Sequence, residues 1–140
     1  MAHWLVKSEP AAWSWDEQVA CGDKGTAWTG VRNHLAKKHL MAMQAGERAF
    51  FYHSNEGKAV VGIVEVAKTH YPDPTDESGR FVVVDMRALG PVKTPVTLAA
   101  IKADLRLAGM ELVVNSRLSV QPVREDEWRL ICEMGGVKPS

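Results

Sequence analysis

The segment at residues 28–33, WTGVRN, holds two side chains suited to ligand binding, an indole and a guanidinium. A helix is predicted over 31–43, and in it Arg32 would fall in the middle of an apolar face. Because a guanidinium is rarely buried without a partner, we expect a carboxylate or a ligand edge beside it, with Glu9 as the predicted carboxylate. Trp28 precedes this helix in a loop, where binding residues often lie. The spacing therefore indicates a pocket.

Other aromatic and cationic side chains could extend such a pocket. The chain has five tryptophans, and core packing is the simplest reason for most of them. Trp15, which opens a short predicted helix, could instead join Trp28 at the mouth of a cleft. Lys37, Lys38 and Arg48 belong either to an ordinary solvated surface or to a set of phosphate contacts. An aromatic platform bordered by cations suits a single splayed nucleotide, since stacking contributes ~1 to 3 kcal/mol per base.

Catalytic and metal chemistry find weaker support. His53 and Ser54 could form a base and a nucleophile, but neighbours on a strand point to opposite faces of the sheet. On a helix, the rings of His34 and His39 would diverge by roughly 140°, which disfavours a metal site. The motifs of dinucleotide, nucleotide triphosphate, zinc peptidase and serine hydrolase sites are missing from the sequence. We therefore expect neither a metal nor a cofactor.

Composition limits the possible partners. The chain has 140 residues, with 17 basic and 17 acidic side chains, so no strong uniform field draws it to a polyanion. Any nucleic-acid contact must be local. No apolar run reaches the ~20 residues that span a bilayer, and two distant cysteines fit reduced thiols. We expect one domain over 1–140 in a soluble, cytoplasmic protein that has no contact with membranes.

The predicted elements mix strands and helices without regular alternation. Runs of β-branched and aromatic residues predict strands over 4–7, 48–53, 60–69, 81–89 and 118–120. Caps and glycines predict helices over 14–21, 31–43, 97–105 and 125–134. The pattern favours an α+β fold with a small curled β-barrel of about five to six mostly antiparallel strands, patched by helices. In RLSVQPV, residues 117–123, the alternation puts Arg117, Ser119 and Gln121 on one polar face. This face is either the solvated side of an edge strand that ends at Pro122 or a surface that looks into the cavity of Arg32.

Six strings, in order along the chain, carry a resemblance to a known family. They are WLVKSEP, WTGVRN, FFYHS, VVGIVEV, YPDPT and RLSVQPV, and together they extend from about residue 2 to residue 134. The chain resembles the EVE domain of the PUA-like superfamily. The resemblance implies a curled β-barrel with surrounding helices, related to YTH and ASCH domains. It also implies an aromatic-lined pocket for a modified base of DNA or RNA, such as methylated or hydroxymethylated cytosine.

The resemblance also implies a set of base-binding residues. They are Lys7, Ser8, Glu9, Trp28, Val31, Arg32, Asn33, Tyr52, His53, Ser54, Asp73, Arg117 and Ser119. One position departs from the family string WDGVRN, because Thr29 stands where the family usually has aspartate. The loss of that carboxylate beside Trp28 can change which base edge is accepted.

These observations lead to one main hypothesis and two alternatives. The main hypothesis is a non-enzymatic reader, monomeric, that binds a modified base from a single strand or flipped out of a duplex. The second is an enzyme acting on a nucleic acid or nucleotide, with His53 as base and Glu9 or Asp73 as acid. The third is a protein-interaction module with a vestigial pocket. The choice between DNA and RNA stays open, and a eukaryotic source would imply a nuclear protein.

Overall fold

The structure, a computed structural model, describes residues 2–139 and contains strands interleaved with helices. The strands are β1 (His3–Ser8), β2 (Thr26–Ala27), β3 (Arg48–His53), β4 (Ala59–Pro72), β5 (Val82–Thr97) and β6 (Val120–Val123). The helices are α1 (Trp15–Ala20), α2 (His34–Ala42), α3 (Leu98–Ala103), α4 (Glu111–Val114) and α5 (Glu125–Gly135). Two short 3-10 turns, Gly22–Lys24 and Leu105–Leu107, complete the order.

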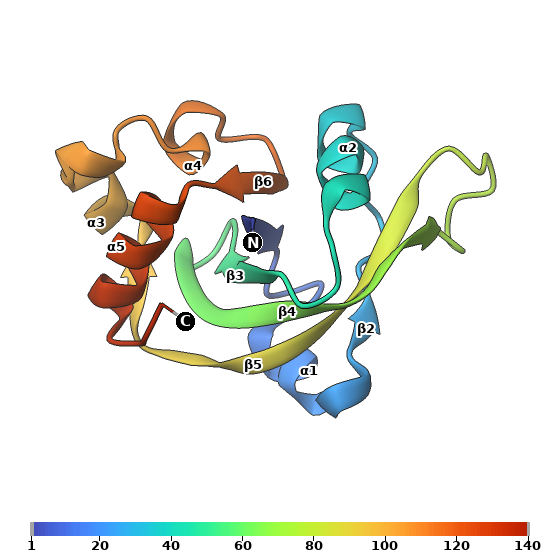
Figure 1. Cartoon of the computed structure of the whole chain (residues 1–140), viewed down its shortest axis with the longest axis horizontal. Helices are drawn as coiled ribbons and strands as arrows, with labels where there is room; N and C mark the ends of the chain where they lie inside the picture. Colours follow the sequence, from blue (N-terminus) through green and yellow to red (C-terminus); the bar gives the residue numbers. More distant parts are fainter. Residues whose placement is uncertain (1, 140) are drawn as a thin grey trace.

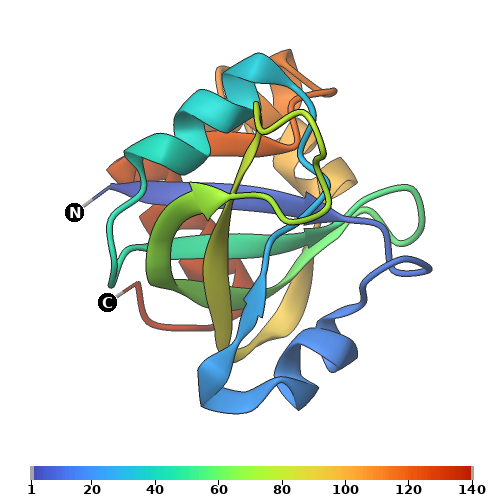
Figure 2. The same ribbon diagram turned by 90° about the vertical axis from the view of Figure 1, so that its right-hand side faces the viewer.

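The described strands form one mixed sheet of six strands in the order β2-β5-β4-β3-β1-β6. Within it, β1 and β3 run parallel, with Ser8 opposite His53, and the other neighbours are antiparallel. The predicted α+β fold with mostly antiparallel strands is confirmed, and the sheet is strongly curled (Figures 1 and 2). It remains open, however, with β2 and β6 at its edges, so it is a curled sheet rather than a closed barrel.

Strand β5 extends well beyond the predicted end at residue 89. It continues through Pro91 to Thr97, with Pro91 opposite Gly62 of β4. The other neighbour of β5, the short β2, covers only Asp85 and Met86. Beyond Met86, β5 therefore has a hydrogen-bonded neighbour on the β4 side only. A proline is tolerated there, because its missing N–H can face the side of the strand that has no partner. The prediction of a strand over 81–89 therefore ended it too early.

Both faces of the sheet are covered, which explains the continuously apolar β4. Phe51 belongs to a core under α1 and α2, whereas its neighbour Phe50 belongs to a second core under α3, α4 and α5. In Figure 1 α3, α4 and α5 lie in the left part of the molecule, and α2 lies above β4 with the β4–β5 hairpin to its right. Gly62 lies directly below the Trp15 indole, because a Cβ there would come within 2.4 Å of that ring. The absence of a side chain at Gly62 thus makes room for a tryptophan.

Helix α1 has the predicted capping box, with the Ser14 hydroxyl accepting from the Glu17 N–H and the Glu17 carboxylate accepting from the Ser14 N–H. The predicted start of the second helix at residue 31 is wrong. Asn33 is its N-cap, accepting from the Ala36 N–H at 2.9 Å, and α2 begins at His34. Asparagine is a strong N-cap, so the helix starts after it. Arg32 consequently lies outside the helix and not on its apolar face.

Candidate ligand-binding pocket

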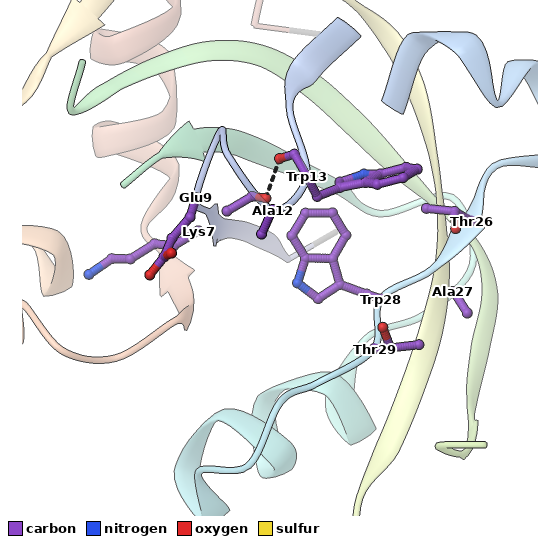
Figure 3. A pocket seen from close by; sticks show the side chains of 9 residues that line it. Lys7, Glu9, Ala12, Trp13, Thr26, Ala27, Trp28 and Thr29 are labelled. Carbon is purple, nitrogen blue, oxygen red and sulfur yellow. Dashed lines mark hydrogen bonds between the residues drawn. The ribbon is translucent and has the colours of Figure 1, made fainter. Parts of the chain in front are cut away.

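A pocket of about 450 Å³ opens between the turn that follows β1 and the segment that contains β2 (Figure 3). A volume of this size is typical of sites for small organic ligands. The pocket is lined by Lys7, Ser8, Glu9, Ala12, Trp13, Thr26, Ala27, Trp28 and Thr29. Its walls therefore combine two indoles with methyl groups, hydroxyl groups, one amine and one carboxylate.

Trp13 forms one wall, and buried polar groups fix its ring. Its Nε1–H donates to Gln18 Oε1 at 2.8 Å, and its carbonyl oxygen accepts from the Ser8 hydroxyl. Gln18 is completely buried, and its Nε2 donates to the Met86 carbonyl at 2.9 Å. Met86 pairs with Thr26 across the β2–β5 ladder. One buried amide thus connects the Trp13 wall to β5, the strand that pairs with β2.

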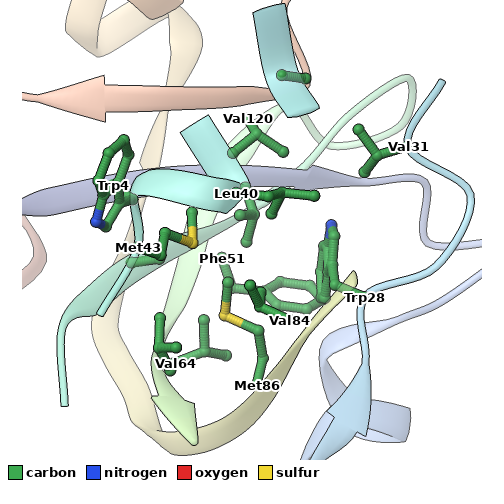
Figure 4. Packing of buried hydrophobic residues seen from close by; sticks show 14 of the residues in the cluster. Trp4, Trp28, Val31, Leu40, Met43, Phe51, Val64, Val84, Met86 and Val120 are labelled. Atoms are coloured by element: carbon green, nitrogen blue, oxygen red, sulfur yellow. The ribbon is translucent and has the colours of Figure 1, made fainter. Parts of the chain in front are cut away.

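Trp28 forms the second wall and also belongs to the hydrophobic core. Its side chain is 7% exposed and makes an edge contact with Phe51, with ring centroids 5.6 Å apart (Figure 4). Over residues 2–139, Gln121 Oε1 is the one buried side-chain nitrogen or oxygen without a hydrogen-bond partner. The Trp28 Nε1–H, which has no partner in that range either, is therefore accessible. In Figure 3 this nitrogen faces the hollow, so the pocket contains a hydrogen-bond donor that the protein does not use.

The loop after Trp28 is held by Asp73, whose side chain is fully buried. Asp73 Oδ2 accepts from the Gly30 N–H at 3.0 Å and from Arg32 Nη1 at 2.9 Å. Asp73 Oδ1 accepts from the Thr75 N–H and hydroxyl, both at 2.7 Å. Burial alone would raise the pKa of the Asp73 carboxyl, but hydrogen bonds from Thr75, Arg32 and Gly30 outweigh it and lower the pKa to about 2. A permanent carboxylate thus ties the Trp28 loop to the β4–β5 hairpin.

This ion pair corrects the predicted pairing of Arg32 with Glu9. The prediction assumed that Arg32 lay on a helix face near the turn after β1, but Arg32 precedes the N-cap and reaches the hairpin instead. Its side chain is 41% exposed and also donates to the Thr75 hydroxyl at 3.0 Å. Glu9 is an exposed residue at the pocket. Of the predicted site residues, Lys7, Ser8, Glu9 and Trp28 line the pocket, and Arg32 with Asp73 lies behind the Trp28 loop.

Several other predicted site residues support the surrounding backbone. His53 Nε2 accepts from the Trp15 N–H at 3.1 Å, at the start of α1, and burial lowers the pKa of this imidazole. Trp15 is 8% exposed and packs its ring on Phe51, so it belongs to the core and not to the pocket wall. The Ser54 N–H donates to the Ser8 carbonyl at 2.9 Å. Val31, another predicted site residue, is 6% exposed and belongs to the hydrophobic core.

Tyr52 and the 117–123 segment point elsewhere. Tyr52 packs in the core under α5, on the face opposite to Phe51, and burial raises the pKa of its phenol. Arg117 is exposed, and Ser119 contributes its carbonyl oxygen to the Lys7 N–H. Gln121 is completely buried, and its amide donates to the Leu118 carbonyl at 2.9 Å. The predicted polar face shared with Arg32 is therefore wrong, because the chain turns into β6 only at Val120.

The cations are distributed around the molecule. Lys7 Nζ donates to the Ser116 carbonyl at 2.6 Å, and burial lowers the pKa of this amine at the pocket edge. Lys37 lies over the Phe81 ring, 5.9 Å from its centroid, and Lys38 is exposed. Arg48 is opposite His3 at the start of β1, so at ~3.3 Å per residue it is about 16 Å from the pocket end of that strand.

The sequence reasoning missed Ala12, Trp13, Thr26, Ala27 and Thr29 as lining residues and Gln18 as their support. The sequence did contain a signal for Trp13. It is an aromatic residue in a turn directly before a capping box, and binding residues often lie in such loops.

Over the described residues 2–139, no group of three or more His, Cys, Asp or Glu side chains is arranged to hold a metal ion. In that range no helix is both long and apolar enough to cross a bilayer.

Comparison with known proteins identifies the family of this chain. The family model described as the EVE domain matches residues 2–134. The chain belongs to the EVE domain family. It is similar to human thymocyte nuclear protein 1, with 30% identity over 171 residues, covering 99% of this chain and 76% of the human protein. The chicken protein of the same name is 32% identical, covering 98% of this chain and 70% of that protein.

Solved structures of relatives have the same fold. A protein from Rhodopseudomonas palustris is 65% identical with a TM-score of 0.92, covering 97% of this chain and 94% of that one. A protein from Agrobacterium tumefaciens is 48% identical with a TM-score of 0.94, covering 98% and 94%. The human THYN1 protein, crystallised in complex with DNA containing 5-methylcytosine, is 30% identical with a TM-score of 0.90, covering 99% and 100%. An ASCH protein from Zymomonas mobilis, 13% identical with a TM-score of 0.59, shares the fold alone.

Proposed function

We propose that this protein is a non-enzymatic reader that binds one modified nucleobase in the pocket between Trp13 and Trp28. The observation that carries the proposal is the pair of indoles lining one pocket of about 450 Å³, with the Trp28 Nε1–H unused by the protein. Membership of the EVE family and the human relative crystallised with 5-methylcytosine-containing DNA support it.

The pocket chemistry fits a cytosine-like edge. Stacking on an indole contributes ~1 to 3 kcal/mol. The exposed Glu9 carboxylate can accept from an exocyclic amino group, as acidic side chains do with cytosine N4, and the Trp28 Nε1–H can donate to a ring nitrogen or carbonyl. Thr29 offers a methyl and a hydroxyl where the family usually has a carboxylate, so Glu9 is the one acidic residue among the lining residues.

The methyl groups of Ala12 and Ala27 provide apolar contact for a base substituent. One added methyl in such a site is worth ~1 to 3 kcal/mol, or about 10 to 200-fold in affinity. Extraction of a base from an intact duplex costs a few kcal/mol. A single strand or an already flipped base is therefore the favoured partner, in DNA or RNA, and the reader acts as a monomer in the cytoplasm, or in the nucleus of a eukaryotic source.

A nucleoside titration tests the proposal. Cytidine and 5-methylcytidine, with their deoxy forms, are titrated into wild-type protein and Trp28→Ala while tryptophan fluorescence and melting temperature are followed. We expect the wild type to bind a methylated nucleoside 10 to 200-fold more tightly than the plain one. Trp28→Ala should weaken that binding by roughly 1 to 3 kcal/mol. Equal affinity for plain and modified nucleosides in the wild type would refute the reader.

The catalytic alternative loses support from the position of His53. Its Nε2 already accepts from the Trp15 N–H at 3.1 Å, and the residue does not line the pocket. A base in that position has no free lone pair at Nε2 for a substrate proton. Incubation with plain and modified oligonucleotides, followed by mass spectrometry, separates the two hypotheses. Turnover that depends on His53 would favour the enzyme.

A further inference from the structure

A cluster of cations surrounds an aromatic ring beside the pocket loop, and we call it the Phe81 cluster: Arg32, His34, Lys37 and Phe81. The Arg32 guanidinium carbon is 5.5 Å from the Phe81 ring centroid, and Lys37 Nζ is 5.9 Å from it. The His34 ring is tilted against Phe81, with centroids 5.2 Å apart. Three basic side chains, one from the loop before α2 and two from α2 itself, thus converge on one ring of the β4–β5 hairpin.

Two acidic side chains of the same hairpin, Asp73 and Asp76, accept hydrogen bonds from its loop, whereas Glu77 is exposed. Asp73 is fully buried against Arg32 and the loop backbone. Asp76 accepts from the Ser78 hydroxyl and from the N–H groups of Ser78, Arg80 and Phe81. These bonds lower the pKa of the Asp76 carboxyl to about 2, and the bond from the Ser78 hydroxyl has the largest effect. Asp73 and Asp76 therefore organise the loop, and neither of them forms an ion pair with His34 or Lys37.

Lys37 and His34 have no acidic partner among residues 2–139, since no ion pair of either side chain occurs there. His34 is exposed, and Lys37 is held by the Phe81 ring instead of by a carboxylate. A cation without a counter-charge is free to bind an anion. The chain has a net charge of zero, so a general excess of basic residues does not explain why these side chains gather here.

The Phe81 cluster is continuous with the pocket. Thr29 lines the pocket, the next residue Gly30 donates to Asp73, and Arg32 follows on the same loop. The hairpin tip stands beside α2 in both ribbon views (Figures 1 and 2). A polynucleotide with one base between Trp13 and Trp28 would have its neighbouring phosphates within reach of this loop.

We propose that the Phe81 cluster is a second contact surface, which binds the sugar-phosphate backbone of a single strand next to the nucleotide in the pocket. This inference rests on the proposed reader function and adds the region that holds the strand. Its cations recognise phosphates without regard to sequence or base modification, because phosphate contacts position a strand and base contacts specify it. The pocket and the cluster therefore make separable contributions.

The test measures the salt dependence of binding to a fluorescent single-stranded oligonucleotide, with and without one 5-methylcytosine. The variant is the double substitution His34→Gln and Lys37→Gln, which leaves the Arg32–Asp73 pair in place. Lys102→Gln is the matched control, because Lys102 is an exposed cation on α3, which packs on the opposite face of the sheet. Melting temperature confirms that all three proteins are folded.

At pH 7 we expect the slope of log K against log salt to become less steep by ~0.7 for each lost cationic phosphate contact, and therefore by ~0.7 for the loss of the Lys37 charge in the double variant. Between 50 and 200 mM salt, the Kd of the wild type should then rise about 2.6-fold more than that of the double variant. Both oligonucleotides should be affected equally, and Lys102→Gln should behave as the wild type. An unchanged slope in the double variant, or an equal change in Lys102→Gln, would overturn the proposal.

Failure of this inference can be told apart from failure of the reader function. A free deoxynucleoside has no phosphate, so its affinity reports on the pocket alone and should be the same in the wild type and the double variant. Preference for the modified nucleoside with an unchanged oligonucleotide slope rejects the Phe81 cluster alone. A reduced slope without any preference for the modified base rejects the reader and leaves the phosphate surface standing.

Discussion

Removal of the Asp73 charge should destabilise the protein in a pH-dependent way. Asp73→Asn keeps the shape of the side chain but leaves the Arg32 guanidinium without its carboxylate, which lies 2.9 Å away. The pKa of Asp73 is lowered from 3.8 to about 2 in the folded protein. At about 1.36 kcal/mol per pKa unit, this difference corresponds to roughly 2.4 kcal/mol. Because the Arg32 side chain is 41% exposed, water screens part of the attraction, and we expect ~1 to 2 kcal/mol.

The sign of the pH dependence follows from the lowered pKa. The carboxylate form is favoured by folding, so the stabilisation is fully present above about pH 5 and is lost as the pH falls towards about 2. Urea unfolding of wild type and Asp73→Asn at pH 7 and at pH 3 measures it. The difference in free energy of unfolding should be ~1 to 2 kcal/mol at pH 7 and should shrink at pH 3.

Asp126→Asn provides the matched control for this experiment. It removes a carboxylate that pairs with Arg124 at 3.0 Å, but both side chains are more than half exposed, so a smaller loss is expected. The reasoning fails if Asp73→Asn loses no more stability than Asp126→Asn at pH 7. It also fails if the loss caused by Asp73→Asn is the same at both pH values. Tryptophan fluorescence during the titration reports whether the Trp28 loop moves when the pair is broken.

Two further substitutions test the supports of the pocket. Gln18→Met should cost roughly 1 to 3 kcal/mol of stability and weaken nucleoside binding, because it leaves the Trp13 Nε1–H and the Met86 carbonyl without the Gln18 amide. Urea unfolding measures the loss of stability, and a nucleoside titration measures the loss of affinity. An unchanged affinity would show that the amide does not position the indole. Gly62→Ala should cost ~1 to 3 kcal/mol, since the new methyl would lie 2.4 Å from an indole ring. Gly109→Ala, which meets nothing within 4 Å, is the control in thermal unfolding, and equal melting temperatures for the two alanine variants would contradict the packing argument.

Much of the local structure could be predicted from the sequence. The strand over 48–53 and the capping box at Ser14 agree with the structure, because side-chain alternation and N-capping depend on residues close together in the chain. The family could be predicted as well, since several uncommon strings occur in one order. Errors arose at the ends of elements, such as the start of α2 after Asn33, where one cap outweighs an apolar pattern.

By itself, the sequence determined the α+β class, most elements, and four residues that line the pocket, among them Trp28. Only the tertiary structure decided which carboxylate meets Arg32, because Asp73 is 41 residues away and a curved hairpin brings it there. It also brought Trp13 and Trp28 to one pocket and linked Trp13 to β5 through the buried amide of Gln18. Contacts of this kind depend on how separate strands pack, and no local pattern of residues encodes them.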